Sequence, residues 1–131
     1  MNAKVILGCR ILLGLIFTVF GLNGLMMIFT GAGFIPMPPP SPEMGAIMGG
    51  FFSAKYLMPL VKLLQVVSGI MLLTNKYVNA ALTFLGPIIV NILGIHLFVD
   101  LAGAPMAIFI TVLWAILVCS RWNSFKPLLT A

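Results

Sequence analysis

The chain has 131 residues, of which 62% are hydrophobic and only 7% charged, and its formal net charge is +5. A domain of this size has too little interior to bury so much apolar surface, which excludes the soluble globular classes. Its seven Lys and Arg residues are scattered, not clustered on one face, so the positive charge does not indicate nucleic-acid binding. The composition predicts an all-α integral membrane protein with one domain, residues 1–131.

The first predicted element is a membrane-spanning helix over residues 5–29. At about 1.5 Å per residue this range is long enough to cross a bilayer. Arg10 lies about one turn inside its start, and we expect its side chain to extend to the lipid headgroups. Gly14, Thr18 and Gly21 share one face at helical spacing. Such small residues favour close helix contact, and here they offer a face for homo-oligomerisation.

A proline-rich segment, residues 36–42, follows the first span and predicts an extended arm with solvated backbone groups. Ser41, Pro42 and Glu43 form a helix start, with a capping hydroxyl, a proline in the first turn and an acid at the positive end of the helix dipole. The helix expected over residues 44–55 is too short to span a bilayer. We therefore expect it to lie at the membrane surface or to be re-entrant.

Three further apolar stretches predict spans over residues 56–73, 77–99 and 104–120. The turns between the second, third and fourth spans are short. Consecutive helices joined by short turns are antiparallel, so the predicted architecture is an up-and-down bundle of four helices.

The charged residues near the ends of the spans predict the orientation. One side of the membrane carries Lys4, Arg10, Lys76, Arg121 and Lys126 together with both termini, whereas the other carries Glu43, Lys55 and Asp100. Lys and Arg mark the cytoplasmic side. We expect a protein of the plasma membrane (the inner membrane of a bacterium) with both termini in the cytoplasm and the proline-rich loop outside.

Six polar side chains fall inside the predicted spans or at their edges, all in the outer half of the bundle. A charged group at membrane depth costs roughly 3 kcal/mol on insertion scales, and such groups usually face a partner or a cavity. We therefore predict a ligand-binding cavity beneath the proline-rich arm, and its candidate residues are Asn23, Lys62, Gln65, Asn91, His96 and Asp100.

Helical spacing places these residues in pairs. Lys62 and Gln65 share a face, as do His96 and Asp100. Asp100 is expected either to hold His96 in one tautomer or to form an ion pair with Lys62. An ammonium beside a neutral imidazole suits the carbonyls of a quinone, an anionic lipid headgroup or a proton relay. The alternative is structural: a snorkelling lysine, a loop cap and amides that bind neighbouring helices together.

No set of residues in the sequence predicts catalysis by this chain alone. A single His provides no pair of haem ligands, and nine Met in an apolar chain are typical of packing. No catalytic triad, phosphate-binding loop or dinucleotide motif is present. We expect no metal site and no catalytic residue.

The order of these motifs resembles the DoxX family of small membrane proteins with four helices. The resemblance covers nearly the whole chain and is carried by Arg10-Ile-Leu-Leu-Gly14-Leu-Ile-Phe17, Phe20-Gly21-Leu-Asn23-Gly24, Phe34-Ile-Pro36-Met-Pro-Pro-Pro40, Pro59-Leu-Val-Lys62, and Pro87-Ile-Ile-Val-Asn91 leading to His96-Leu-Phe-Val-Asp100.

The resemblance implies a function in membrane redox chemistry. Members of the family include a small subunit of a thiosulfate:quinone oxidoreductase and partners in redox or oxidative-stress complexes. An acidic residue is common in the family where Gln65 stands, so a charged lysine–acid pair in the second span is not carried over. We expect an accessory membrane subunit of a redox or quinone-linked assembly, with lipid or quinone in the cavity. The alternatives are a small oligomeric carrier or permeation protein and a purely structural assembly protein.

Overall fold

The computed structural model describes residues 1–131 and contains helices only. The four long helices begin and end within two residues of the predicted ranges. They are α1 (Ala3–Thr30), α3 (Leu57–Leu73), α4 (Val78–Phe98) and α5 (Ala104–Ser120). The shorter elements are α2 (Pro42–Ser53), α6 (Trp122–Phe125), and the 3-10 turns η1 (Leu101–Gly103) and η2 (Lys126–Leu129).

Three stretches are long and apolar enough to cross a membrane: α1, α4, and η1 together with α5. Helices α2 and α3 pass the same test only as a pair that is bent by 93° at their junction. In the apolar 18-residue window of each of these three stretches, 22–28% of the window is buried inside the chain. The remaining apolar surface faces outward, as expected of a protein whose solvent is lipid. The prediction of an all-α chain is confirmed, and three stretches, or four if the bent pair is one span, are candidates for crossing a membrane.

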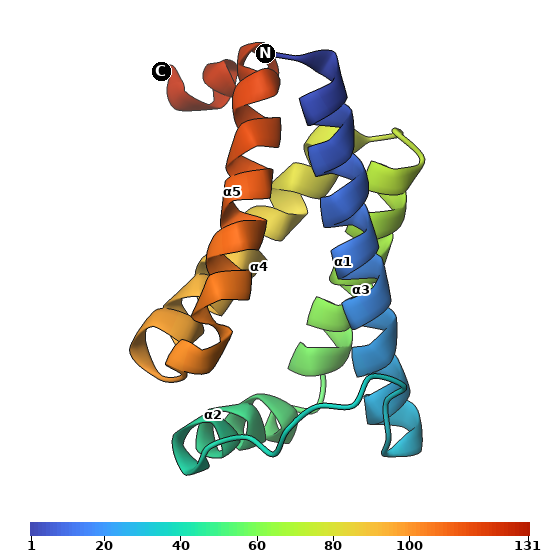
Figure 1. Ribbon diagram of the computed structural model, residues 1–131, viewed down its shortest axis with the longest axis vertical. Helices are drawn as coiled ribbons and strands as arrows, with labels where there is room; N and C mark the ends of the chain where they lie inside the picture. The colour runs from blue at the N-terminus through green and yellow to red at the C-terminus, as the bar shows by residue number, and fades with distance from the viewer.

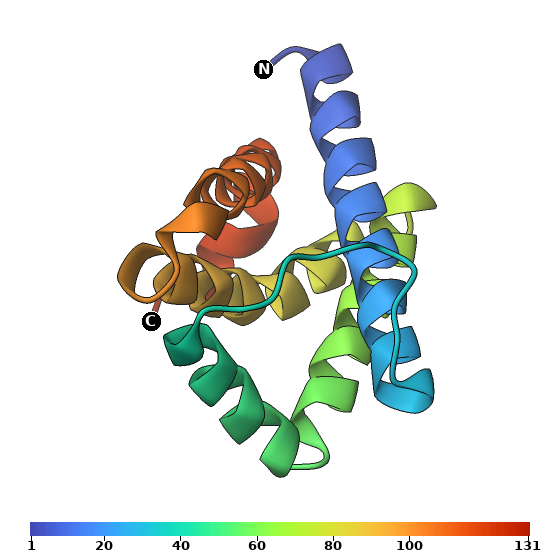
Figure 2. The same ribbon diagram turned by 60° about the horizontal axis from the view of Figure 1, so that its bottom comes forward.

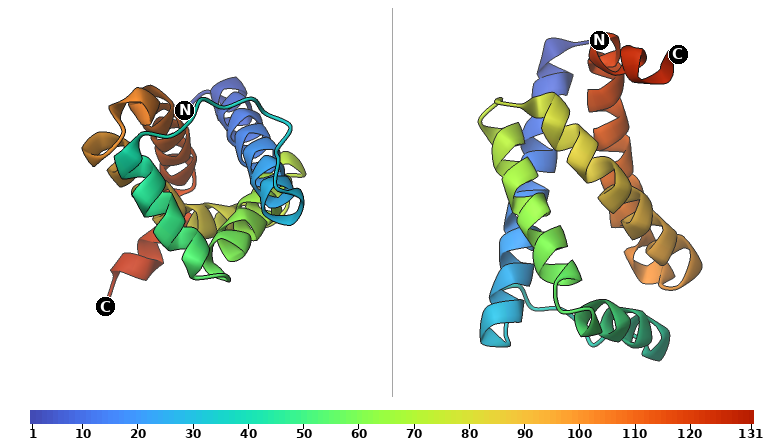
Figure 3. Two further views of the ribbon diagram at one scale, coloured as in Figure 1. Left: turned by 90° about the horizontal axis from the view of Figure 1, so that it is seen from below. Right: turned by 180° about the vertical axis from the view of Figure 1, so that it is seen from behind.

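The long helices form a ring in which α1 contacts α3, α3 contacts α4, α4 contacts α5, and α5 contacts α1. The pair of α1 and α3 and the pair of α4 and α5 lie close together at the end where both termini lie and separate toward the opposite end (Figure 1). The proline-rich arm crosses that open end from α1 toward α4 and α5, and α2 then returns to α3 (Figures 2 and 3). The arm and α2 therefore border the opening between the separated helices.

Twelve buried side chains form one apolar core at the end that carries the termini. It draws on residues 9–17 of α1, the last turn of α3, residues 78–89 of α4 and residues 110–117 of α5. Its members are Cys9, Leu13, Phe17, Leu72, Val78, Ala81, Leu82, Leu85, Ile89, Ile110, Leu113 and Leu117. The core thus fills only the end at which the helices converge.

Helices α1 and α3 lie close together because both present glycine at their contact. A Cβ on Gly69 would meet the side chain of Thr18 and the carbonyl of Gly14, and a Cβ on Gly21 would meet Val66. Small residues permit this approach of two backbones in a membrane. The predicted close contact is present, but it lies within the chain. The expectation that this face joins two copies is corrected, since α3 already covers it.

Arg10 connects the same two helices at the core end. Its guanidinium donates to the carbonyls of Leu72 and Leu73, in the last turn of α3. Carbonyls in the last turn of a helix have no partner within the helix and carry the negative end of its dipole. Arg10 therefore caps α3. This differs from the expectation that its side chain extends to the lipid headgroups.

The predicted start of α2 is present. The Ser41 hydroxyl accepts from the N–H of Met44 at 3.2 Å, Pro42 occupies the first turn, and Glu43 follows it. After α2, Lys55 has a φ of 61°, in the left-handed region. This residue lies in the short connection over which the chain turns by 93° from α2 into α3.

Candidate functional site

A cavity of about 390 Å³ lies between α2, α3 and α4, at the end where the two pairs of helices separate. Nine of its fourteen lining residues are hydrophobic. Its polar lining comes from α3 and α4, and those residues are Lys62, Gln65, Asn91 and His96. A partly enclosed apolar cavity with a few polar groups is the usual form of a small-ligand site.

Lys62 enters the cavity wall from α3, and its stem packs against α1. A Cβ on Gly24 would meet the Cγ, Cδ and Cε atoms of Lys62, so the glycine makes room for this stem. The ammonium donates to Oε1 of Gln65 at 3.3 Å. Gln65 is 4% exposed and is one of three buried polar residues of the chain. The two side chains form a polar group on one face of α3, as their spacing predicted.

No carboxylate lines the cavity, so the ammonium of Lys62 has no negative partner there. The expected ion pair between Lys62 and Asp100 does not form. The only ionisable side chains of opposite type within 4.0 Å of each other are His96 and Asp100, with 3.9 Å between Nδ1 and Oδ2. The cavity therefore has an uncompensated positive group, which suits a ligand head rich in acceptors or negative charge.

His96 lies at the end of α4, and its ring is held by the turn that follows. Nδ1 donates to the backbone carbonyl of Asp100 at 3.1 Å. The ring also packs against Gly103, where a Cβ would overlap Nδ1 and Cε1. Asp100 itself does not line the cavity. Of the two roles expected for Asp100, the structure shows the one in which it orients His96, through the backbone carbonyl.

Asn91 lies on the cavity side of α4 and is solvent-accessible. Its amide donates to the carbonyl of Pro87 at 2.9 Å, one turn earlier in the same helix. It therefore forms no bond to another helix.

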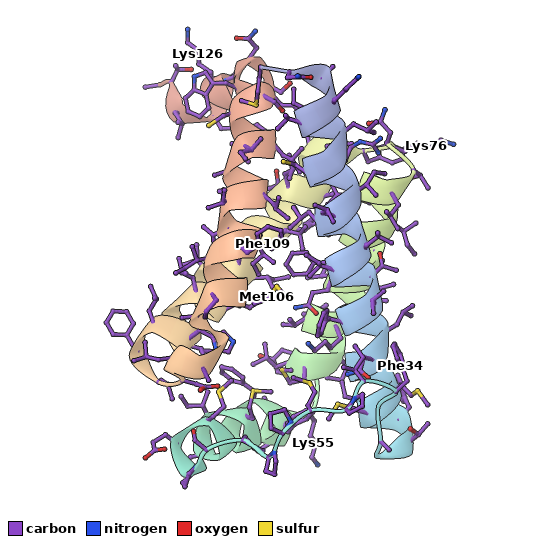
Figure 4. The ribbon with its side chains drawn as sticks, in the orientation of Figure 1. Phe34, Lys55, Lys76, Met106, Phe109 and Lys126 are labelled. Atoms are coloured by element: carbon purple, nitrogen blue, oxygen red, sulfur yellow. The ribbon has the colours of Figure 1, made fainter.

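Asn23 is the residue whose position departs most from the expected site, because it does not line the cavity. It is 3% exposed, and its Oδ1 accepts from the N–H groups of Phe34 and Ile35 at 2.8 and 2.9 Å. Gly33 packs against the same side chain. Phe34 and the start of the arm lie beside the end of α1 (Figure 4). Asn23 thus attaches the proline-rich arm to α1, a structural role.

The apolar wall that α2 contributes was not part of the predicted site. Met44, Met48 and Phe51 line the cavity and stand at positions i, i+4 and i+7 of one helix. This spacing places them on one face of α2. The same spacing in the sequence is the signal from which this wall of the cavity could have been predicted. Methionine adapts its shape to irregular ligands, so α2 provides a deformable cover for the cavity.

Comparison with known proteins finds no match: no family model, no curated protein and no solved structure is similar to the chain at a significant level.

Proposed function

We propose that the chain is an accessory membrane subunit that binds an amphipathic ligand of the quinone class in the cavity between α2, α3 and α4. The observation that carries this proposal is the grouping of Lys62, Gln65, Asn91 and His96 in an otherwise apolar cavity. Polar groups of this kind bind a polar ring, and the methionine-lined wall of α2 accepts the start of an apolar tail.

The electrostatics of the cavity favour a head that accepts hydrogen bonds. Lys62 is the only formally charged residue on its wall, given a neutral His96. A quinone oxygen accepts a hydrogen bond from an ammonium without the cost of burying a second charge.

The distribution of charge supports a membrane orientation with both termini in the cytoplasm. Lys76 and Lys126 lie toward the end that carries the termini, whereas Lys55 lies at the opposite end (Figure 4). Lys4, Arg10 and Arg121 add to the first group. Since Lys and Arg mark the cytoplasmic side, α2 and the arm would lie on the outer face of a bacterial inner membrane. With α3 as the fourth span, the topology would be an up-and-down bundle with α2 at the interface.

The placement of the core favours ligand binding over permeation. None of the residues that line the cavity belongs to the apolar core at the terminal end. A cavity that ends on a packed apolar core binds a molecule without passing it to the other side. The resemblance to the DoxX family supports the proposed setting, a redox assembly that contains other membrane subunits.

The test is the affinity of the purified full chain for a benzoquinone with a decyl tail, measured by calorimetry in detergent and expressed as a mole fraction. A hydrogen bond to a charged group contributes about 1.5–3 kcal/mol, so Lys62→Met should weaken binding about 10- to 100-fold. The matched control is Lys76→Met, in the exposed turn between α3 and α4, which should bind as the natural chain does. Equal affinity of both variants would contradict the proposed site.

A further inference from the structure

A second hollow, an apolar groove, lies between α4, α5 and the C-terminal segment that α6 and η2 form (residues 122–129). Its volume is about 250 Å³, and seven of its nine lining residues are hydrophobic. No residue lines both this groove and the cavity between α2, α3 and α4. The groove is therefore separate from the site described above.

Trp114 of α5 is fixed across the groove, whereas the rim of the groove is open. Its Nε1 donates to the carbonyl of Leu82 at 2.9 Å, which holds the ring against α4. On the C-terminal segment, Trp122 is 46% exposed, and Leu128 and Leu129 are each 73% exposed. Apolar side chains that remain open around an apolar groove indicate that another apolar group covers them. Since α4 and α5 are candidate spans, the covering group is hydrocarbon.

The C-terminal segment is amphipathic, although it is short. The residues that it contributes to the groove are all apolar: Trp122, Phe125, Leu128 and Leu129. The polar residues between them do not line the groove: Asn123, Ser124 and Lys126. A segment with one apolar and one polar face, and with a tryptophan, is typical of the boundary between hydrocarbon and headgroups. The groove therefore extends from the level of the headgroups into the hydrocarbon layer.

Arg121 lies at the terminal end of the groove. Its guanidinium donates to Oδ1 of Asn79 at 3.2 Å. Asn79 precedes two lining residues of α4, Thr83 and Gly86, by four and seven positions, so it shares their helix face. Arg121 forms no other side-chain hydrogen bond, and most of the five N–H groups of its guanidinium remain available to a ligand.

Lys126 adds a second positive charge, and no acidic side chain balances the two. Its side chain is exposed, forms no hydrogen bond, and lies at the end of the molecule that carries the termini (Figure 4). The chain has only two acidic residues, Glu43 at the start of α2 and Asp100 after α4. Helix α2 lies at the opposite end of the molecule (Figure 1). The end of the groove is thus complementary to a negatively charged head.

We infer that the groove binds one acyl chain of an anionic phospholipid, with the lipid phosphate at Arg121 and Lys126. A basic pocket beside spanning helices is a known form of site for anionic headgroups, and guanidinium groups bind phosphate oxygens through charge-assisted hydrogen bonds. The lipid site is distinct from the proposed quinone cavity, and it would remain if no quinone bound there.

The chain carries its own probe of the groove, because both of its tryptophans line it. Bromine on an acyl chain quenches the fluorescence of a tryptophan that it contacts. The experiment places the full chain in phosphatidylcholine nanodiscs and adds brominated phosphatidylglycerol or brominated phosphatidylcholine with the same acyl chains. One Lys or Arg near the membrane surface strengthens binding of an anionic lipid about fivefold. Half-maximal quenching should therefore need about 5- to 25-fold less phosphatidylglycerol than phosphatidylcholine.

Two variants assign the preference to the basic residues. Lys126→Gln should reduce it about fivefold, and Arg121→Gln combined with Lys126→Gln should reduce it to about twofold or less. Circular dichroism verifies folding. Because the Lys126 side chain is exposed and has no partner, Lys126→Gln carries the test if the double variant does not fold.

The matched control is Lys4→Gln combined with Lys76→Gln. It removes the same charge from the same end, but Lys76 lies on the opposite side of the molecule from Lys126 (Figure 4). This variant should keep the preference of the natural chain. An equal loss in the control would overturn the inference, because the preference would then reflect the charge of the whole surface.

Two further outcomes would also overturn it. Equal quenching by the two lipids would show that the head is not recognised. Weak quenching by both would show that no lipid occupies the groove, and a dimer in native mass spectrometry would then identify a second copy of the chain as its cover.

Discussion

The two ends of the bundle are built from the same helices but differ in packing. At the terminal end, Leu82 and Leu85 of α4 are fully buried in an apolar core. Farther along the same helix, Asn91 and His96 line an accessible cavity. Pro87 lies between the two groups, inside α4. The comparison indicates that one end is packed as an apolar core and the other leaves polar groups accessible to a ligand.

The largest expected effect is on stability and arises at the packed end. Leu85→Ala removes a side chain with 0% exposure, and such a change costs about 2–5 kcal/mol. Unfolding in mixed micelles of increasing dodecyl sulfate measures the loss. The matched control, Leu97→Ala, changes a side chain of the same helix that is 42% exposed and should cost much less. Equal losses would show that α4 is not divided into a packed half and an open half.

Asn23 tests whether the open end can be changed independently of the core. Asn23→Ala leaves the N–H groups of Phe34 and Ile35 without their partner, which costs about 1–3 kcal/mol. Because the arm leads into α2, hydrogen exchange should accelerate over residues 33–53 and stay unchanged in the core.

The control for this prediction is Asn123→Ala, an exposed asparagine near the C-terminus. This variant should leave the rate of hydrogen exchange in the arm the same as in the natural chain. If Asn23→Ala accelerated exchange in α4 and α5 as much as in the arm, the two ends would be one cooperative unit.

The smallest effect is expected near the boundary between the two regions. Nε1 of Trp114 on α5 donates to the carbonyl of Leu82 at 2.9 Å, and its ring packs over Gly86. Trp114→Phe keeps an aromatic ring but loses this bond, at a cost of about 1 kcal/mol in the same unfolding assay. Trp122 forms no side-chain hydrogen bond, so Trp122→Phe should have a smaller effect. A larger loss for Trp122→Phe would contradict the role given to Trp114.

The helices could be predicted from the sequence because each follows from local information. Runs of apolar residues define the four long helices, and Ser41 with Pro42 marks the start of α2. The divergence of the helices could not be predicted, since it depends on how side chains from distant segments pack. The same limit explains the small residues of α1. Their spacing predicted a close contact, but only the structure shows that Gly69 of α3 provides it.

The depth of the candidate site within the bundle could be predicted from the sequence, but the partners of its side chains could not. Placing polar residues in one layer brought together Lys62, Gln65, Asn91 and His96, which share the cavity. Depth does not define the partner of a side chain, and for this reason Asn23 was misplaced: its partners are backbone N–H groups of the arm. Asp100 follows the end of α4, so its position depends on the turn and not on helical spacing.

The most direct test of the cavity is photolabelling of the full chain in lipid nanodiscs. The probe is a decyl benzoquinone carrying a photoreactive azide, and the labelled peptides are identified by mass spectrometry. Labelling that an excess of the decyl benzoquinone suppresses should fall on residues 44–51 of α2, 57–65 of α3 and 87–96 of α4, and it should be lost in Lys62→Met. Labelling confined to α5 and α6, or undiminished by the competitor, would contradict the assignment of the cavity as a ligand site.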